Sequence, residues 1–118
     1  MLVEFLMQNN DMNIHYKVFG KRDGNIITFP DKSVPNTMIT IEYWDTEVEI
    51  KRHGDVNMLQ FFRLNERCEG YYKNNSGINL EIASFTKKMN VSNNLIEIEY
   101  DYYLDDDLQS SNKLKIIF

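Results

Sequence analysis

The chain has 118 residues, of which 42% are hydrophobic and 13% aromatic, so it can bury the core of one domain and is too apolar for a disordered chain. Its 18 acidic residues outnumber its 13 basic ones and give a net charge of −5, which argues against binding to nucleic acid or to an anionic membrane. The single cysteine excludes an intrachain disulfide, and no apolar run approaches the ~20 residues of a membrane-spanning helix.

Polar and apolar residues alternate through most of the chain, a period typical of strands that have one buried face and one wet face. In chain order, this alternation predicts strands over residues 3–7, 14–18, 38–43, 46–52, 56–64, 78–82, 95–102 and 114–118. The clearest is 95–102, in which Glu97, Glu99 and Asp101 share the outer face. The adjacent Phe61 and Phe62 also fit a short helical turn, but we assign residues 56–64 as a strand with a bulge.

Turn-forming residues separate the predicted strands. They occur at Asp23-Gly24 and in residues 53–55, 74–77, 92–94 and 105–107. Residues 30–36 hold both prolines and form the longest irregular segment. Strands that recur every ~8–12 residues are typical of a sandwich or a barrel. Because closure removes exposed edge strands, we expect one antiparallel all-β domain over residues 1–118. The expected form is a closed barrel of about eight to ten short strands whose last strand pairs with its first, with an open β-sandwich as the alternative.

Four blocks of the sequence occur in the order found in a known bacterial family. The letters VEIKRHG at residues 48–54 look like that family's V-x-V-x-R-x-G stretch, and residues 58–62 look like its next apolar strand. Residues 72–86 are similar to its tyrosine, turn glycine and alternating strand, and IEIEYD at residues 96–101 is similar to its I-x-I-x-Y-D strand. Over residues 24–118 the chain therefore resembles the YwiB-like family, a domain of unknown function. The resemblance implies a closed, calycin-like (lipocalin-like) β-barrel from a low-GC Gram-positive bacterium or a relative, and it assigns no functional residues.

Arg52 is the most informative single residue. It lies in phase with Val48 and Ile50, so we expect it on the apolar face of its strand. Because an unpaired buried guanidinium is costly, Arg52 needs a partner. Either it anchors a ligand carboxylate or phosphate in the barrel mouth, or it sits at the strand end and bonds backbone carbonyls or an internal glutamate.

Four tyrosines share apolar faces with aliphatic residues: Tyr16, Tyr43, Tyr100 and Tyr102. Aromatic rings with a polar tip suit the wall of a partly wet cavity, but they also fill ordinary cores with the hydroxyl at the rim. A barrel of about eight strands can be filled completely by its own side chains. Tyr43 and Trp44 are neighbours on opposite faces, so we expect one of them to be exposed.

The remaining reactive residues do not form a recognisable site. His15 and His53 lie on a polar face and beside a turn, without metal-ligand spacing, and Cys68 is interpreted as a small buried hydrophobe. Residues 105–107 lack the spacing of a calcium loop, and no glycine-rich phosphate loop occurs. We therefore expect no cofactor, no metal and no catalytic residue. The N-terminal stretch carries Glu4 and no basic leader, so we expect a cytoplasmic protein.

These observations leave two functional hypotheses. The first is a non-enzymatic barrel that binds a small apolar or anionic amphipathic ligand, with Arg52, Tyr43, Tyr100 and Tyr102 as candidate ligand-binding residues. The second is a protein-interaction or regulatory module with a filled barrel and an acidic outer face, acting as a homodimer or with a protein partner. A lumen of a few hundred Å³ would favour the first hypothesis. A packed lumen with an exposed apolar patch around Trp44 or Phe61 would favour the second.

Overall fold

The computed structural model describes residues 1–118 as eleven β-strands without a helix. The strands are β1 (Leu2–Gln8), β2 (Asn13–Phe19), β3 (Lys21–Asp23), β4 (Ile26–Pro30), β5 (Thr37–Tyr43), β6 (Val48–Gly54), β7 (Val56–Phe62), β8 (Arg67–Asn74), β9 (Asn79–Val91), β10 (Leu95–Leu104) and β11 (Asp107–Ile117). No helix long and apolar enough to cross a membrane is present.

Each predicted strand segment overlaps an observed strand, but the count is eleven rather than eight to ten. The three additional strands are β3, β4 and β8, whose sequences do not alternate. β4 contains the adjacent pair Ile26-Ile27 and ends at Pro30, and β8 contains Gly70. Within the predicted segment 56–64, residues 56–62 form the strand β7, and its pairing with β6 continues without the predicted bulge. Register shifts occur instead where β10 pairs with its two neighbours, because Lys87 of β9 and Gln109 of β11 are extra residues without a partner in β10.

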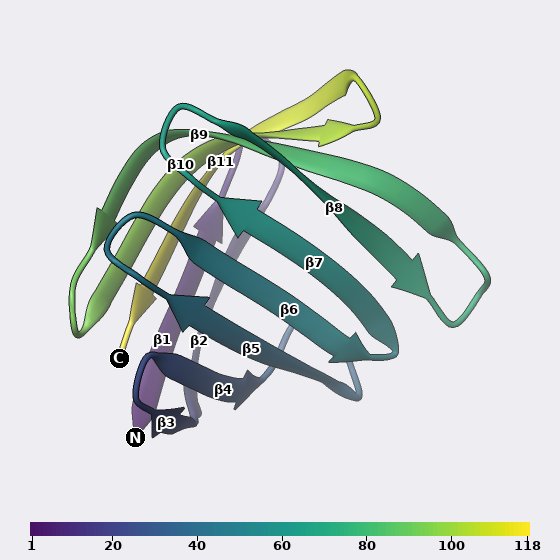
Figure 1. Cartoon of the computed structure of the whole chain (residues 1–118). Coiled ribbons are helices and arrows are strands. Elements are labelled where there is room, and N and C mark those ends of the chain that lie inside the picture. The colour runs from purple at the N-terminus through teal and green to yellow at the C-terminus, as the bar shows by residue number, and fades with distance from the viewer.

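The strands form one antiparallel sheet that curls into a nearly closed barrel, not an open sandwich (Figure 1). The order is β2-β1-β11-β10-β9-β8-β7-β6-β5-β4-β3, so the first strand pairs with the last, with Phe5 opposite Ile116. The two ends of this order, β2 and β3, are consecutive in the chain and are separated only by Gly20. One bent segment therefore pairs with β1 through its first half and with β4 through its second half, and it brings the two edges of the sheet together.

Gly20 lies at the corner where β1 and β4 approach each other. Its backbone N–H donates to the carbonyl of Met1 (2.9 Å). A Cβ atom at this position would lie 2.8 Å from the carbonyl oxygen of Thr28 and 3.1 Å from a methyl group of Val3. The corner therefore requires a residue without a side chain. The predicted tight turn at Gly24 is also present, and its φ of 59° explains the glycine.

The barrel has two different ends. At one end lie both chain termini and the β3–β4 turn, close to one another in Figure 1. Arg22 caps this closed end: its guanidinium donates to the Tyr43 hydroxyl and to the carbonyl of Asn93 and lies 5.3 Å from the ring centre of Phe118. The other end, called the mouth here, carries the β1–β2, β4–β5, β6–β7, β8–β9 and β10–β11 connections. The sixteen-residue hydrophobic core fills the interior between the mouth and Arg22.

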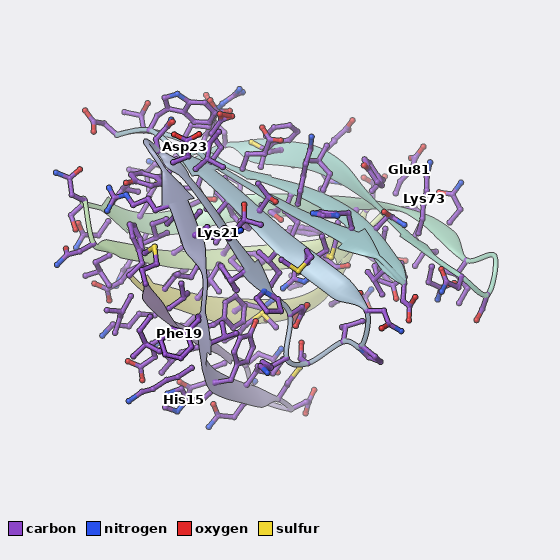
Figure 2. The ribbon with its side chains drawn as sticks, turned by 90° about the horizontal axis from the view of Figure 1, so that it is seen from below. His15, Phe19, Lys21, Asp23, Lys73 and Glu81 are labelled. Carbon is purple, nitrogen blue, oxygen red and sulfur yellow. The ribbon has the colours of Figure 1, made fainter.

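The outer face is polar, as the alternation predicts. Asp101 pairs with Lys87 (2.9 Å) and Glu99 with Lys88 (3.5 Å) across β9 and β10. Figure 2 shows His15 and Phe19 on the outer face of β2, and the exposed His15 contacts Glu4 (2.6 Å). Tyr43 is buried and its neighbour Trp44 is 42% exposed, which confirms the predicted split between them.

Candidate functional site

A cavity of about 470 Å³ occupies the mouth of the barrel. Residues from the β1–β2 and β4–β5 connections and from eight strands line it, and eleven of its eighteen lining residues are hydrophobic. Three methionines contribute to the wall, Met7, Met12 and Met58. The alternating strands point every second side chain inward, and these side chains line the interior of the barrel. At the mouth they do not fill it, so they form the wall of a cavity. The lumen is therefore open at one end and packed at the other.

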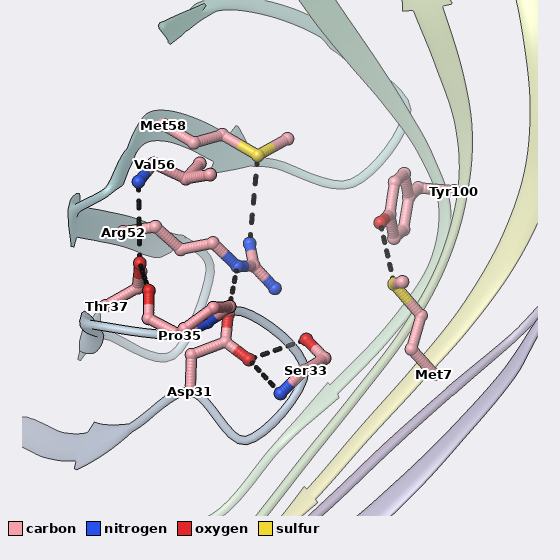
Figure 3. Close-up of polar contacts among 9 residues, drawn as sticks. All are labelled: Met7, Asp31, Ser33, Pro35, Thr37, Arg52, Val56, Met58 and Tyr100. Carbon is pink, nitrogen blue, oxygen red and sulfur yellow. Dashed lines mark hydrogen bonds and ion pairs between the residues drawn. The ribbon is translucent and has the colours of Figure 1, made fainter. Parts of the chain in front are cut away.

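Arg52 is the one charged residue that lines this cavity. Its Nε donates to the Oδ2 of Asp31 (3.1 Å), and the two side chains are 13% and 1% exposed (Figure 3). Its Nη1 lies 3.8 Å from the sulfur of Met58, and its Nη2 makes no hydrogen bond within the protein. Arg52 thus faces inward, as its phase predicts. It has an internal carboxylate partner, which comes from the β4–β5 connection and is an aspartate rather than the expected glutamate.

The β4–β5 connection holds Asp31 in place. The backbone N–H and the hydroxyl of Ser33 both donate to Oδ1 of Asp31, at 2.9 and 2.6 Å (Figure 3). This is an Asx turn, in which an aspartate side chain accepts from a residue two positions later. Both carboxylate oxygens accept hydrogen bonds, and the Asp31 side chain is almost fully buried and does not line the cavity, so Asp31 neutralises Arg52 from outside the cavity wall.

Two candidate tyrosines, Tyr100 and Tyr102, lie in the cavity wall on β10, and Figure 3 shows Tyr100 across the cavity from Arg52. The Tyr100 hydroxyl donates to the sulfur of Met7 at 3.8 Å, a weak contact. Burial, and to a smaller extent the neighbouring Tyr100 and Tyr72, raises the pKa of Tyr102, so its hydroxyl stays protonated. The Tyr102 hydroxyl makes no hydrogen bond within the protein and can donate one to a bound molecule.

Tyr43 and Tyr16 lie elsewhere. Tyr43 is at the closed end, where its hydroxyl accepts from Arg22, so it is not part of the cavity wall. The hydroxyl of Tyr16 is buried without a hydrogen-bond partner. Burial and the nearby Asp31 raise the pKa of Tyr16. The structure therefore brings three of the four candidate residues together, Arg52, Tyr100 and Tyr102, and places Tyr43 at the opposite end.

Asp55 fastens the rim of the mouth. Its two carboxylate oxygens accept from the side-chain amides of Asn75 (2.9 Å) and Asn36 (3.2 Å), which joins the β4–β5, β6–β7 and β8–β9 connections. Neither Asp55 nor Asp31 was predicted as part of the site. The D-x-S pattern at residues 31–33 is a local signal for the Asx turn. The pairing of Asp31 with Arg52 could not be predicted, because the two residues are twenty-one positions apart and strand periodicity does not relate them.

The wall of the cavity contains no carboxylate, histidine or cysteine. Cys68 lies in β8, where burial raises the pKa of its thiol. The arrangement can enclose an apolar group and donate hydrogen bonds from Arg52 and Tyr102. Elsewhere in the molecule, no three acidic, histidine or cysteine side chains are close enough to hold a metal ion.

Comparison with curated proteins found no significant sequence match. Among solved structures, the crystal structure of the YwiB protein from Bacillus subtilis is similar, with a TM-score of 0.69 and 18% sequence identity, covering 98% of this chain and 85% of that chain. This likeness shows a shared fold and confirms the resemblance found in the sequence blocks. The model of a domain of unknown function, DUF1934, matches residues 4–116, nearly the whole chain. The chain therefore belongs to the DUF1934 family, a domain of unknown function, and it has the YwiB-like barrel fold.

Proposed function

We propose that this protein is a non-enzymatic, cytoplasmic binding protein that holds a small apolar or amphipathic molecule in the mouth of its barrel. The observation that carries the proposal is the open cavity of about 470 Å³, which falls within the ~300–1,000 Å³ range of small-molecule sites. A barrel of this size could have been filled by its own side chains, but here the apolar residues of the mouth surround space.

The chemistry of the wall favours binding over catalysis. Its apolar majority would gain free energy by excluding water from a ligand, and the flexible side chains of Met7, Met12 and Met58 can adapt to irregular shapes. Arg52 and Tyr102 supply hydrogen-bond donors from the wall. The wall holds serine and tyrosine hydroxyls but no carboxylate, histidine or lysine that could act as a general base for them, and the paired Arg52 is a poor candidate for that role.

The direct test is native mass spectrometry of the protein as purified from its own host, followed by denaturation and extraction. We expect a stoichiometric small molecule that is lost when Ser110, in the cavity wall on β11, is replaced in the variant Ser110→Phe. The matched control is Ser111→Phe, since Ser111 lies next in the strand on the outer face and should leave the bound molecule in place. A ligand-free wild type, or equal loss in both variants, would overturn the proposal.

Methionine methyl groups can locate the bound molecule. The chain has six methionines, and three of them line the cavity. In NMR spectra of protein labelled with ¹³C at the methionine methyls, adding back the extracted molecule should shift the signals of Met7, Met12 and Met58. The signal of Met38 should not move, because this residue lies in β5 outside the cavity wall.

The interaction-module hypothesis keeps one specific observation in its favour. On the outer face, Phe19 is 78% exposed and its cross-strand partner Leu2 is 51% exposed, which is unusual for neighbouring large apolar residues. Sedimentation of the ligand-free protein distinguishes the two functions. A stable dimer that dissociates in the variant Phe19→Ser would support self-association, whereas a monomer with a bound small molecule would support the binding function.

A further inference from the structure

The balance of charge in the cavity restricts what its ligand can be. Arg52 is the only ionic group in the wall, and its positive charge is already matched by Asp31, which is 1% exposed and lies directly behind it. The wall therefore carries an ion pair of zero net charge. A binding site for an anion would instead present a cation whose charge is not yet compensated.

The same ion pair leaves hydrogen-bond donors unused. A guanidinium has five N–H groups, and in Arg52 only the Nε donor reaches Asp31. One contact of Nη1 goes to the weakly accepting sulfur of Met58, and Nη2 has no partner. Tyr102, on the facing strand β10, adds a hydroxyl that no protein group engages. The wall thus offers donors without an excess positive charge.

We propose that the polar end of the ligand is a neutral hydrogen-bond acceptor, such as the carbonyl of an amide or ester, and not a carboxylate or phosphate. This inference rests on the proposed binding function and narrows it. A neutral carbonyl can accept from Nη2 of Arg52 and lose little hydration. A carboxylate would add a second negative charge to a cation that is already paired, and the apolar cavity would then hold a net charge of −1.

Cationic ligands are excluded by the same geometry. Asp31 is the carboxylate that contacts Arg52, and both of its oxygens accept hydrogen bonds, from Arg52 and Ser33. The other carboxylate at the mouth, Asp55, lies on the rim outside the cavity wall, and both of its oxygens accept from asparagine amides. An ammonium group would therefore meet the guanidinium of Arg52 without an anion to balance it. The expected ligand has an apolar body and a single uncharged acceptor at the end that reaches Arg52.

The test compares ligand pairs that differ only in the charge of the head group. Octanamide and octanoate, and the matching pairs with six, ten and twelve carbons, are titrated into the wild-type protein at pH 8 and followed by calorimetry and by the methyl signals of Met7, Met12 and Met58. We expect the amide of the best-fitting length to bind at least roughly tenfold more tightly than the carboxylate. Equal or tighter binding of the carboxylate would overturn this inference while leaving the binding function intact.

Replacing Asp31 tests the cause of the preference. The variant Asp31→Asn keeps an acceptor for Ser33 but removes the compensating charge, so octanoate should gain affinity relative to octanamide by tenfold or more. The control Asp45→Asn changes the net charge equally at an exposed position in the β5–β6 connection of the closed end and should leave the ratio unchanged. If Asp31→Asn does not fold, the wild-type ranking alone decides the inference. If no member of any pair binds, the inference and the proposed binding function both fail.

Discussion

Arg52 and Asp31 form the most buried ion pair in the molecule, and each side chain compensates the charge of the other. The variant Arg52→Met would leave the carboxylate of Asp31 buried without its cation, which typically costs about 3–5 kcal/mol of unfolding free energy. The double variant Asp31→Asn/Arg52→Met replaces both charges by neutral groups and should recover a large part of that loss. Urea denaturation of the four proteins in this cycle measures the coupling, with Lys51→Met as an exposed control. An Arg52→Met protein as stable as the wild type would show that the pair has no structural role.

Asp101, on the outer face, makes a pH-dependent contribution to the stability of the fold. Burial alone would raise the pKa of this carboxyl, but the Ser111 hydroxyl (2.6 Å) and the Lys87 ammonium (2.9 Å) outweigh burial and hold its pKa below the ordinary value of 3.8. A carboxyl whose pKa is lower in the folded state stabilises the protein above its unfolded pKa, and this stability is lost as the pH falls through the folded value. The variant Asp101→Asn should therefore lower the thermal midpoint at pH 7, by an amount that corresponds to about 1 kcal/mol or less, and have no such effect at pH 2. Glu97→Gln on the same face is the control, since Glu97 forms no ion pair. A loss of equal size at both pH values would contradict the assignment.

Single residues also show what strand periodicity can and cannot predict. Period two fixes the face of a strand on which a side chain lies, and Arg52, Tyr43 and Tyr100 all point inward as expected. Periodicity does not fix the height along the barrel axis. Tyr43 and Tyr100 therefore looked equivalent in the sequence, although one packs against Arg22 at the closed end and the other lines the mouth. Asp31 was missed because it follows the last residue of β4 in an irregular connection.

At the scale of strands, the corner at Gly20 determines whether the barrel can close. A methyl group there would press on the Thr28 carbonyl and on Val3, which are fixed by the pairing of β4 and β1. We expect Gly20→Ala to lower the unfolding free energy by about 1–3 kcal/mol, as overpacking does in other cores. Lys21→Ala, one residue later and exposed, should change it by less than about 0.5 kcal/mol. Hydrogen exchange should show the Gly20→Ala loss as faster exchange in β2 and β3. A uniform change across the sheet would argue against a local corner.

Strands whose sequences alternate between polar and apolar residues were predicted well, and strands whose sequences do not alternate were missed. β5 alternates over its whole length, and β6 and β10 alternate over residues 48–51 and 95–100, because one face meets the core and the other faces outward. β4 is only five residues long. β8 contains Gly70, where a Cβ atom would collide with the backbone carbonyl of Leu59 at the end of the pairing between β7 and β8. Such strands form because neighbouring strands offer backbone groups for hydrogen bonding, so their position depends on the topology of the sheet and could not be predicted from their own sequence.

At the scale of the whole molecule, closure depends on contacts between the ends of the chain. β11 lies between β1 and β10, so the last strand of the chain is one of the two neighbours of the first strand. Pairing between such distant segments raises the entropy cost of folding and predicts slow folding for a domain of this size. It also means that the order of the strands in space, and not the position of the termini, defines the barrel.

Circular permutation tests this view. Glu4 lies opposite Ile117, so a flexible linker of about six residues can join Phe118 to Met1. A permutant opened between Asp106 and Asp107, at a hairpin tip where the Asp106 side chain is fully exposed, keeps every strand pairing and should unfold at nearly the wild-type urea midpoint. A permutant opened between Lys32 and Ser33 also keeps the strands, but it frees Ser33 from Asp31 and should unfold at a clearly lower midpoint. Equal urea midpoints for the two permutants would show that the bonds between Ser33 and Asp31 do not stabilise the barrel. Failure of the first permutant to fold would show that the barrel depends on chain connectivity as well as on strand order.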